Sequence, residues 1–182
     1  MTRARPQPPA AARISSPRAG PMTAPRRLFP GDPCLRDVLD LIRRSFAFME
    51  GRIDPPSSMH RLSLAALQEQ CRHGEIWAIG TPPAACVFLT PHPDCLYLGK
   101  LAVDGNHRGT GLARALVKLA ATRAAALGLQ VLRLQARIEL TENHTAFARM
   151  GFRKTGETAH TGFAKPTSVT MERAVPGSRA QN

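Results

Sequence analysis

The sequence has few aromatic residues and no long apolar run. Aromatic side chains make up 5% of the 182 residues, with one tryptophan and one tyrosine. No stretch approaches the roughly 18 to 20 apolar residues that a membrane-spanning helix needs, so membrane insertion is not expected. Hydrophobic residues, at 43%, are nevertheless sufficient for the core of one domain.

Cysteine is also scarce, and its spacing argues against several kinds of site. We find no C-x-x-C pair and recognise no secretory signal before the four cysteines, Cys34, Cys71, Cys86 and Cys95. Reduced thiols in a cytoplasmic protein are therefore expected. His92 and Cys95 stand close together in HPDC, but no second ligand pair accompanies them. The sequence predicts an ordinary turn there and no metal site.

Acidic residues are absent from residues 1–27. This segment holds six arginines, which contribute half of the chain's net charge of +12: Arg3, Arg5, Arg13, Arg18, Arg26 and Arg27. The segment is rich in proline and alanine and poor in large apolar side chains, so a disordered basic tail is expected. Its charge suits nucleic acid, but no aromatic residue precedes Phe29 to stack on bases, so we do not expect that partner. A transit peptide, or a start at Met22, stays open. Residues 176–182 are expected to be a flexible C-terminus.

The hydrophobic pattern of residues 28–175 predicts one mixed α/β domain. Helical spacing and strand-like runs alternate with proline- and glycine-rich turns. The expected elements are helices at 32–49 and 58–74, strands at 75–81, 84–90 and 95–103, a helix at 110–127, a strand at 131–138, a helix at 141–150, and strands at 152–160 and 167–175. This order predicts a mixed sheet flanked by about four helices.

The segment HRGTGLARAL, residues 107–116, combines two glycines with the start of a helix, directly after the strand-like LYLGKLAVD. A helix N-terminus has unpaired N–H groups and the positive end of the backbone dipole, so it attracts phosphate. Glycines let the main chain come close to such a ligand. A phosphate-binding turn is therefore predicted. No G-K-[ST] follows, which excludes a Walker loop, and the spacing and context exclude a Rossmann motif.

Two segments in this order resemble the GNAT acyltransferases. RGTGLA, residues 108–113, matches the family's R/Q-x-x-G-x-G/A acyl-CoA motif. ENHTAFARMGF, residues 142–152, resembles the later N-x-x-x-[FY]-x-x-x-G-F segment, one strand and one helix further on. The resemblance covers about residues 28–175. It implies a mostly antiparallel sheet whose fourth and fifth strands splay apart to hold acetyl-CoA as acyl donor.

The resemblance also implies which residues bind. Backbone groups of the fourth strand would hold the pantetheine arm, and the amides of the following turn would hold the pyrophosphate. The donor-binding residues implied are Leu101, Ala102, Val103, Arg108, Gly109, Thr110, Gly111, Leu112, Ala113 and Asn143. The loop between the first two helices would border the acceptor, with Glu50, Arg52 and Asp54 as its contacts. No metal is implied, and a homodimer stays open.

The reaction implied is direct attack of an amine, on a small molecule or a peptide, on the thioester of acetyl-CoA. The amine must first lose a proton, so a base or a water chain is needed. The family commonly has a tyrosine acid where Phe147 stands here, and often a basic glutamate on the fourth strand, which here reads YLGK. The usual acid and base are thus both missing from their familiar positions.

Two residues are candidates to replace them. His160 ends a late strand, and histidine is the side chain that titrates near neutral pH. Tyr97 is on the fourth strand, and regular alternation places it on the same face as Leu101. The alternative function is a protein that binds acetyl-CoA with weak or no turnover.

Overall fold

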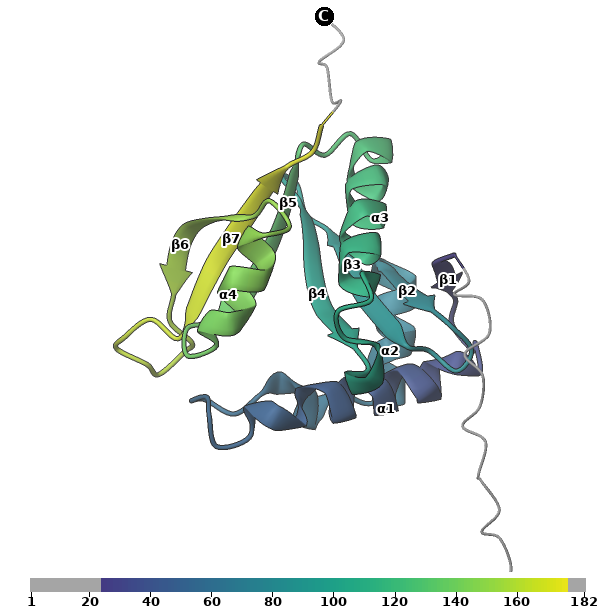
Figure 1. The fold of residues 1–182 in the computed structure, drawn as a ribbon, viewed down its shortest axis with the longest axis horizontal. Coiled ribbons are helices and arrows are strands. Elements are labelled where there is room, and N and C mark those ends of the chain that lie inside the picture. The colour runs from purple at the N-terminus through teal and green to yellow at the C-terminus, as the bar shows by residue number, and fades with distance from the viewer. Residues whose placement is uncertain (1–23, 177–182) are drawn as a thin grey trace, which may run out of the picture.

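A seven-stranded mixed sheet forms the centre of the computed structural model, which describes residues 24–176. The strands lie in the order β1-β2-β3-β4-β5-β7-β6 (Figure 1). Their bounds are β1 Arg26–Leu28, β2 Glu75–Ile79, β3 Ala85–Pro91, β4 Leu96–Val103, β5 Val131–Arg137, β6 Arg153–Thr158 and β7 Ser168–Ala174. Neighbouring strands are antiparallel except β4 and β5, which are parallel. The mixed α/β fold expected from the sequence is confirmed.

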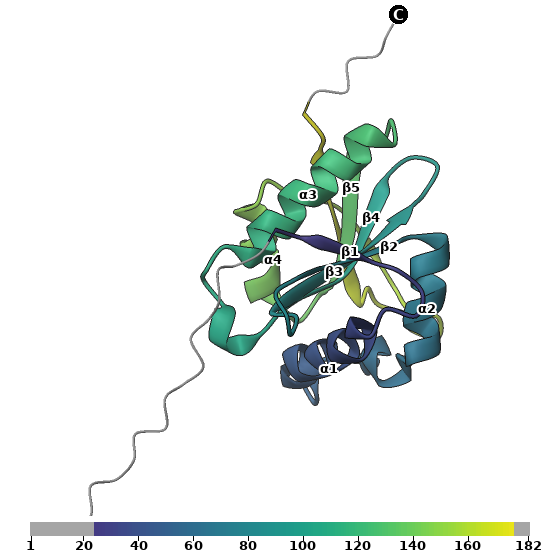
Figure 2. The same cartoon turned by 90° about the vertical axis from the view of Figure 1, so that its right-hand side faces the viewer.

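Four α-helices cover the two faces of this sheet. They are α1 Cys34–Phe46, α2 Leu64–His73, α3 Leu112–Ala126 and α4 Thr141–Ala148, with short 3-10 turns η1 Ala47–Met49, η2 Ser58–Arg61 and η3 Gly105–His107. Figure 2 shows α3 and α4 on one side of the sheet and α1 and α2 on the other. Each face has its own buried cluster: Leu116 of α3 belongs to one, and Ile42 of α1 and Leu67 of α2 belong to the other.

The parallel pair β4 and β5 is joined only at its beginning. Leu96 and Leu98 of β4 pair with Leu132 and Leu134 of β5, and the pairing ends there. Both strands then continue, β4 as far as Val103. The outer edge of β4 pairs with β3, and the outer edge of β5 pairs with β7. Figure 1 shows the two strands diverging below the paired region. The splayed strands expected at this place are thus present.

A β-bulge in β4 changes which side chains share a face. Between Cys86↔Ala102 and Phe88↔Gly99 the strand β3 has one intervening residue and β4 has two. Lys100, one of those two, has a φ of 49°. The extra residue reverses the alternation, so Leu101 packs on the cluster of the α3 side, whereas Thr90, the partner of Tyr97, bonds Gln70 of α2. The expectation that Tyr97 and Leu101 share a face is therefore wrong.

The folded domain begins two residues earlier than the sequence suggested. Arg26 and Arg27 belong to β1, which pairs with β2, and Leu28 is fully buried. Arg27 also lies 3.3 Å from the buried Glu75 carboxylate. Residues 1–23 of the expected tail lie outside the described residues, as do residues 177–182.

The start of the second helix also differs from the expectation. Ser58 begins only the 3-10 turn η2, and α2 starts six residues later at Leu64. The hydroxyl of Ser63 accepts a hydrogen bond from the Ala66 amide at 3.2 Å and so caps α2. The longer loop that results places the turn η2 beside β4, where Lys100 reaches Ser58.

Candidate functional site

A cavity of about 930 Å³ lies where β4 and β5 separate. Its walls come from these two strands, the segment between α1 and α2, helix α4 and the loop between β6 and β7. Among the residues singled out from the sequence, the cavity is lined by Tyr97, Leu101, Asn143 and His160. Side chains from both faces of the sheet reach it, because it passes through the gap between the strands. The structure thus brings together residues from three separate parts of the chain: β4, α4 and the loop between β6 and β7.

The turn before α3 has the backbone of an anion-binding site. Gly109 and Gly111 have φ values of 76° and 90°, which glycine adopts at little cost. A Cβ atom placed on either glycine would meet no heavy atom within 4 Å. The space in front of the turn is therefore open to a ligand.

The amides of this turn are also free. Helix α3 has no side-chain cap, and its first backbone bond to the turn is from Ala115 to the Gly111 carbonyl. Within residues 24–176, the amides of Gly109, Gly111, Leu112 and Ala113 have no acceptor. Unpaired amides at the positive end of a helix dipole fit a phosphate group.

The expected pantetheine contacts on β4 are partly in use by the protein itself. Leu101 lines the cavity, but Ala102 is buried against the α1 and α2 side. The Val103 carbonyl accepts a hydrogen bond from the Ser45 hydroxyl of α1 at 3.2 Å. A carbonyl oxygen has two lone pairs, so Val103 keeps one for a ligand.

The loop after η1 reaches the cavity, but not with its charged side chains. Ile53, Pro55 and Pro56 line the cavity, whereas Glu50, Arg52 and Asp54 do not. Arg52 bonds the Glu142 carboxylate of α4 at 2.7 Å, and the Asp54 amide donates to the Glu139 carboxylate at 3.1 Å. Glu50 lies 3.9 Å from the ring of His60. These charges hold the loop beside α4, so they position the loop's apolar residues.

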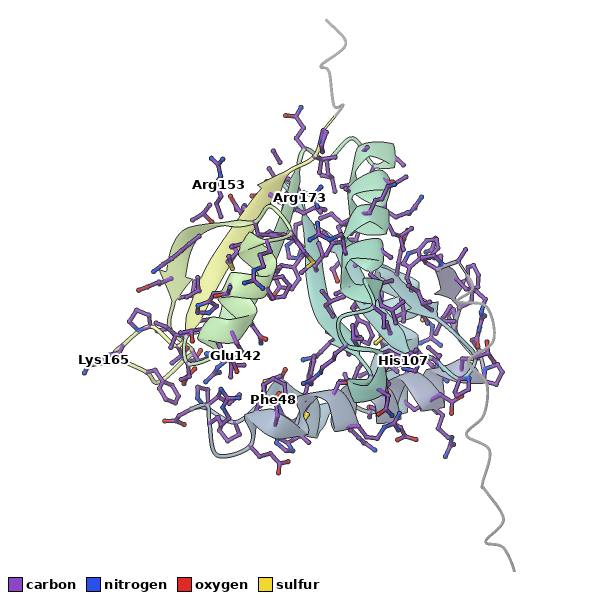
Figure 3. All side chains as sticks on the ribbon, viewed as in Figure 1. Phe48, His107, Glu142, Arg153, Lys165 and Arg173 are labelled. Atoms are coloured by element: carbon purple, nitrogen blue, oxygen red, sulfur yellow. The ribbon has the colours of Figure 1, made fainter. Side chains whose placement is uncertain are left out.

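Phe48 connects this loop to residues 108–113, the turn before α3, which we call the phosphate turn after its expected ligand. The guanidinium carbons of Arg52 and Arg108 lie 5.5 Å and 5.8 Å from the centroid of its ring, within cation–π range. Figure 3 labels Phe48 and Glu142 where the end of α1 faces α4. The ring is 37% exposed. The arginine of the turn is therefore oriented by the segment that follows α1.

The two candidates for proton transfer differ in their surroundings. Burial raises the pKa of the Tyr97 hydroxyl and outweighs a backbone hydrogen bond from Gln135, which lowers it. The phenol therefore stays protonated at neutral pH. His160 is exposed, and its Nδ1 lies 2.5 Å from the Thr167 hydroxyl, which also accepts from the His160 amide. The ring nitrogen Nε2 has no partner within the described part of the chain. Tyr97 therefore suits proton donation, and His160 can present a free nitrogen to the cavity.

Sequence reasoning missed three basic residues that line the cavity, Arg61, Lys100 and Arg137. Arg137 ends β5, and its guanidinium is nearly buried. Its position in VLRLQARI, where charged and apolar residues alternate at the end of a strand, was the available signal. The β4 bulge, by contrast, leaves no mark in the sequence. Phe147, at the familiar tyrosine position, also lines the cavity and packs edge-on against Phe152.

These features match a known family. A sequence model described as the acetyltransferase (GNAT) family matches residues 35–152. This span includes β4, the phosphate turn and α4, and it covers more than half of the chain. The chain therefore belongs to the GNAT acetyltransferase family, whose members are acyl-CoA N-acyltransferases.

Solved structures with this fold are numerous, although their sequences are distant. An acetyltransferase from Streptococcus agalactiae aligns with a TM-score of 0.66 at 16% identity, covering 84% of this chain and 98% of that one. A GNAT-family acetyltransferase from Staphylococcus aureus gives 0.65 at 14% identity, with coverage of 84% and 99%. The ribosomal-protein-S18-alanine N-acetyltransferase from Escherichia coli gives 0.63 at 16%, with 87% and 97%. At these identities the likeness establishes the fold alone.

No curated protein sequence matches the chain. The family uses an acyl-CoA donor and acetylates amines. Among residues 24–176, no helix is both long enough and apolar enough to cross a membrane. The same residues contain no group of three side chains placed to hold a metal ion.

Proposed function

We propose that this protein is an N-acetyltransferase that transfers the acetyl group of acetyl-CoA to an amine by direct attack. The observation that carries the proposal is that β4, which lines the cavity where it separates from β5, leads directly into the turn with free amides before α3. The turn of Arg108–Ala113 would hold the pyrophosphate. Backbone groups of Leu101 and Val103, with Asn143 across the gap, would hold the pantetheine arm.

When bound, acetyl-CoA supplies a thioester carbonyl that a neutral amine can attack. The chain must then accept one proton from the amine, and the sulfur departs either with a proton from a donor or as a thiolate. The His160 ring reaches the cavity, and a proton on Nδ1, directed at Thr167, leaves the Nε2 lone pair free to accept. Tyr97, which keeps its proton at neutral pH, is the donor that the cavity offers.

Phe147 stands where the family commonly has a tyrosine acid, so this position provides no acid for the reaction. Its ring cannot donate a proton, and it packs against Phe152 with ring centroids 5.9 Å apart. A thiol with a pKa of roughly 8.5 leaves as thiolate at modest cost near neutral pH. The reaction can therefore proceed with a base alone, and a residue in the Phe147 position serves to shape the cavity.

Binding and turnover are measured separately to test this function. Titration calorimetry with acetyl-CoA measures binding, and release of free CoA thiol with a panel of amines measures transfer. Saturable binding together with amine-dependent thiol release supports the proposal. Binding without release for any amine would support the alternative of a GNAT-fold protein with little or no turnover. Absence of binding would overturn the assignment of acetyl-CoA as donor.

A further inference from the structure

The charged side chains that line the cavity all have the same sign. Arg61, Lys100 and Arg137 line it, together with the rings of His60 and His160. In the part of the chain that the structure describes, no aspartate or glutamate lines it. The potential inside the cavity is therefore positive, and it disfavours a second positive charge on an acceptor.

Arg137 has a long ion pair with Glu139, but two of its guanidinium nitrogens have no acceptor among the described residues. Its side chain is only 13% exposed, and its Nε and Nη2 atoms are buried with no hydrogen-bond partner. The nearest carboxylate, that of Glu139, lies 3.6 Å from Nε, too far for a hydrogen bond. Buried guanidinium donors without acceptors are costly, and a carboxylate matches them in two-pronged geometry.

Two arginines outside the cavity, Arg123 and Arg133, have carboxylate partners within hydrogen-bond distance. Arg123 makes three hydrogen bonds of 2.6 to 3.2 Å to Glu75. Arg133 bonds Glu172 at 2.5 Å and Asp94 at 2.7 Å. The Nε atom of Arg27 is also buried without a hydrogen-bond partner, but its Nη1 atom lies 3.3 Å from Glu75 and Arg27 does not line the cavity. Arg137 stands out because it faces the cavity.

Lys100 supplies a second positive charge in the same cavity. The β4 bulge directs its side chain toward the turn η2, where Nζ donates to the Ser58 hydroxyl at 2.6 Å. It forms no ion pair with any carboxylate of residues 24–176. Burial lowers the pKa of its ammonium group, and a bound anion would relieve that effect.

These charges are separate from the expected phosphate site. Residues 108–113 do not line the cavity, and their free amides already provide for the pyrophosphate. Lys100 reaches Ser58 of η2, and Arg61 belongs to the same turn, which is the side of the loop expected to border the acceptor. The cations therefore have no evident part in holding the phosphates of the donor.

We infer that the acceptor amine carries an anionic group, a carboxylate or a phosphonate, which binds between Arg137 and Lys100. This inference rests on the proposed acetyl transfer, because it names the class of acceptor for that reaction. An amino acid or a related amino-acid analogue has this combination of groups. A polycationic amine lacks the anion and is repelled by the same side chains.

The anion site can be tested without any turnover. The probes are N-acetyl amino acids, their methyl esters and N-acetyl aminoalkylphosphonates, each titrated by calorimetry into full-length protein saturated with CoA. We expect the acids or the phosphonates to bind about tenfold or more tightly than the esters, because a charge-assisted hydrogen bond contributes that much. The tighter of the two anions identifies the group. Equal affinity of acids, phosphonates and esters would overturn the inference.

A pair of matched variants separates this site from general charge. Arg137→Gln should remove the preference, so that acids and esters bind alike, whereas Arg153→Gln should keep it. Arg153 is exposed on β6, and in Figure 3 it points away from the sheet. Arg137→Lys keeps the positive charge but loses the two parallel N–H donors of the guanidinium, so we expect an intermediate preference for acids over esters. If the Gln variant does not fold, the Lys variant decides, and an unchanged preference in it would count against Arg137.

Failure of the inference and failure of the proposed function give different results. Suppose that the protein acetylates amines, that an anionic group on the amine does not raise the rate, and that acids and esters bind equally. This result overturns only the inference. Binding of anions that depends on Arg137, with no transfer to any amine, supports the anion site and overturns the transferase function. Transfer to amino acids that collapses in Arg137→Gln supports both.

Discussion

Arg52 and Glu142 form an ion pair of 2.7 Å that joins the loop after η1 to the first turn of α4. The loop provides Ile53 and two prolines to the cavity, and α4 provides Asn143 and Phe147. Both charged side chains are about half exposed, so the pair contributes little to the stability of the fold. Its structural effect is to keep the two walls of the cavity together.

We expect Arg52→Ala to raise the KM for the acceptor with little change in melting temperature. Glu142→Ala should have the same effect, and the double variant should be no worse than either single one, because the two side chains act as one contact. Steady-state kinetics and a melting curve measure the two quantities. Arg36→Ala on the exposed side of α1 is the control. Additive increases in KM would mean that the two residues act independently.

Gly111 gives a test of the phosphate turn with a control on the same helix. Gly111 and Gly128 flank α3, both have positive φ, and a Cβ atom on either meets nothing within 4 Å. Substitution by valine strains both backbones similarly, by about 1–3 kcal/mol. We expect only Gly111→Val to lose the gain in melting temperature from acetyl-CoA, which at 100 times its Kd corresponds to about 2.7 kcal/mol. A full gain in Gly111→Val would mean that the turn does not approach the donor.

The Glu75 carboxyl predicts how stability depends on pH. Burial alone would raise its pKa, but hydrogen bonds from Arg123 and Trp77 and the charge of Arg27 lower it below the ordinary value of 4.5. A lowered pKa stabilises the fold above the unfolded-state value, and this contribution is lost as the pH falls through the folded-state value. We expect the free energy of unfolding, measured in urea, to fall more steeply below pH 4.5 in the wild type than in Glu75→Gln.

At neutral pH the same variant should be less stable than the wild type by about 2 kcal/mol, because charge-assisted hydrogen bonds are lost. The loss is limited by water, since Arg27 and Arg123 are about one third exposed. Glu69→Gln, on the exposed surface of α2, is the matched control and should keep the wild-type pH profile. Parallel profiles for the wild type and Glu75→Gln would contradict this account.

The start of the fold can be located by truncation. A chain beginning at Met22 should match the full-length protein in melting temperature and in acetyl-CoA affinity. A chain beginning at Pro30 loses β1, including the buried Leu28 and the contact of Arg27 with Glu75. Loss of one buried leucine costs about 2–5 kcal/mol, so this shorter chain should melt at a clearly lower temperature. Equal melting temperatures for both truncated chains would show that β1 does not stabilise the sheet.

The sequence predicted the elements of the fold better than the details of the site. Hydrophobic periodicity and two motifs fix the order of helices and strands, because both depend on residues close together in the chain. The strand β1 was missed because three residues of an arginine-rich segment carry no pattern of their own. Its pairing with β2 depends on partners about 50 residues away in the sequence.

The sequence also did not reveal that Tyr97 and Leu101 of β4 lie on opposite faces of the sheet, and the reason is related. Alternation is a property of a regular strand, and the bulge at Lys100 interrupts it through pairing with β3. The positive lining of the cavity is a property of the assembled fold, since Arg61, Lys100 and Arg137 come from three segments. Their individual positions in the sequence give no indication that they meet.

The role of His160 in proton transfer makes the last prediction. His160→Gln should lower kcat by about 100-fold, the scale of a lost general base, with a smaller effect on acetyl-CoA binding. Thr167→Val removes the hydroxyl 2.5 Å from Nδ1, so it should lower kcat less, because the ring loses its orientation and not its nitrogen. Phe147→Tyr should be tolerated, since departure of the thiolate needs no acid at neutral pH. The dependence of kcat on pH, measured from pH 6 to 9, tests this assignment. If His160→Gln has a rate and a pH profile close to those of the wild type, His160 has no part in the mechanism. A water chain would then be the route for the proton.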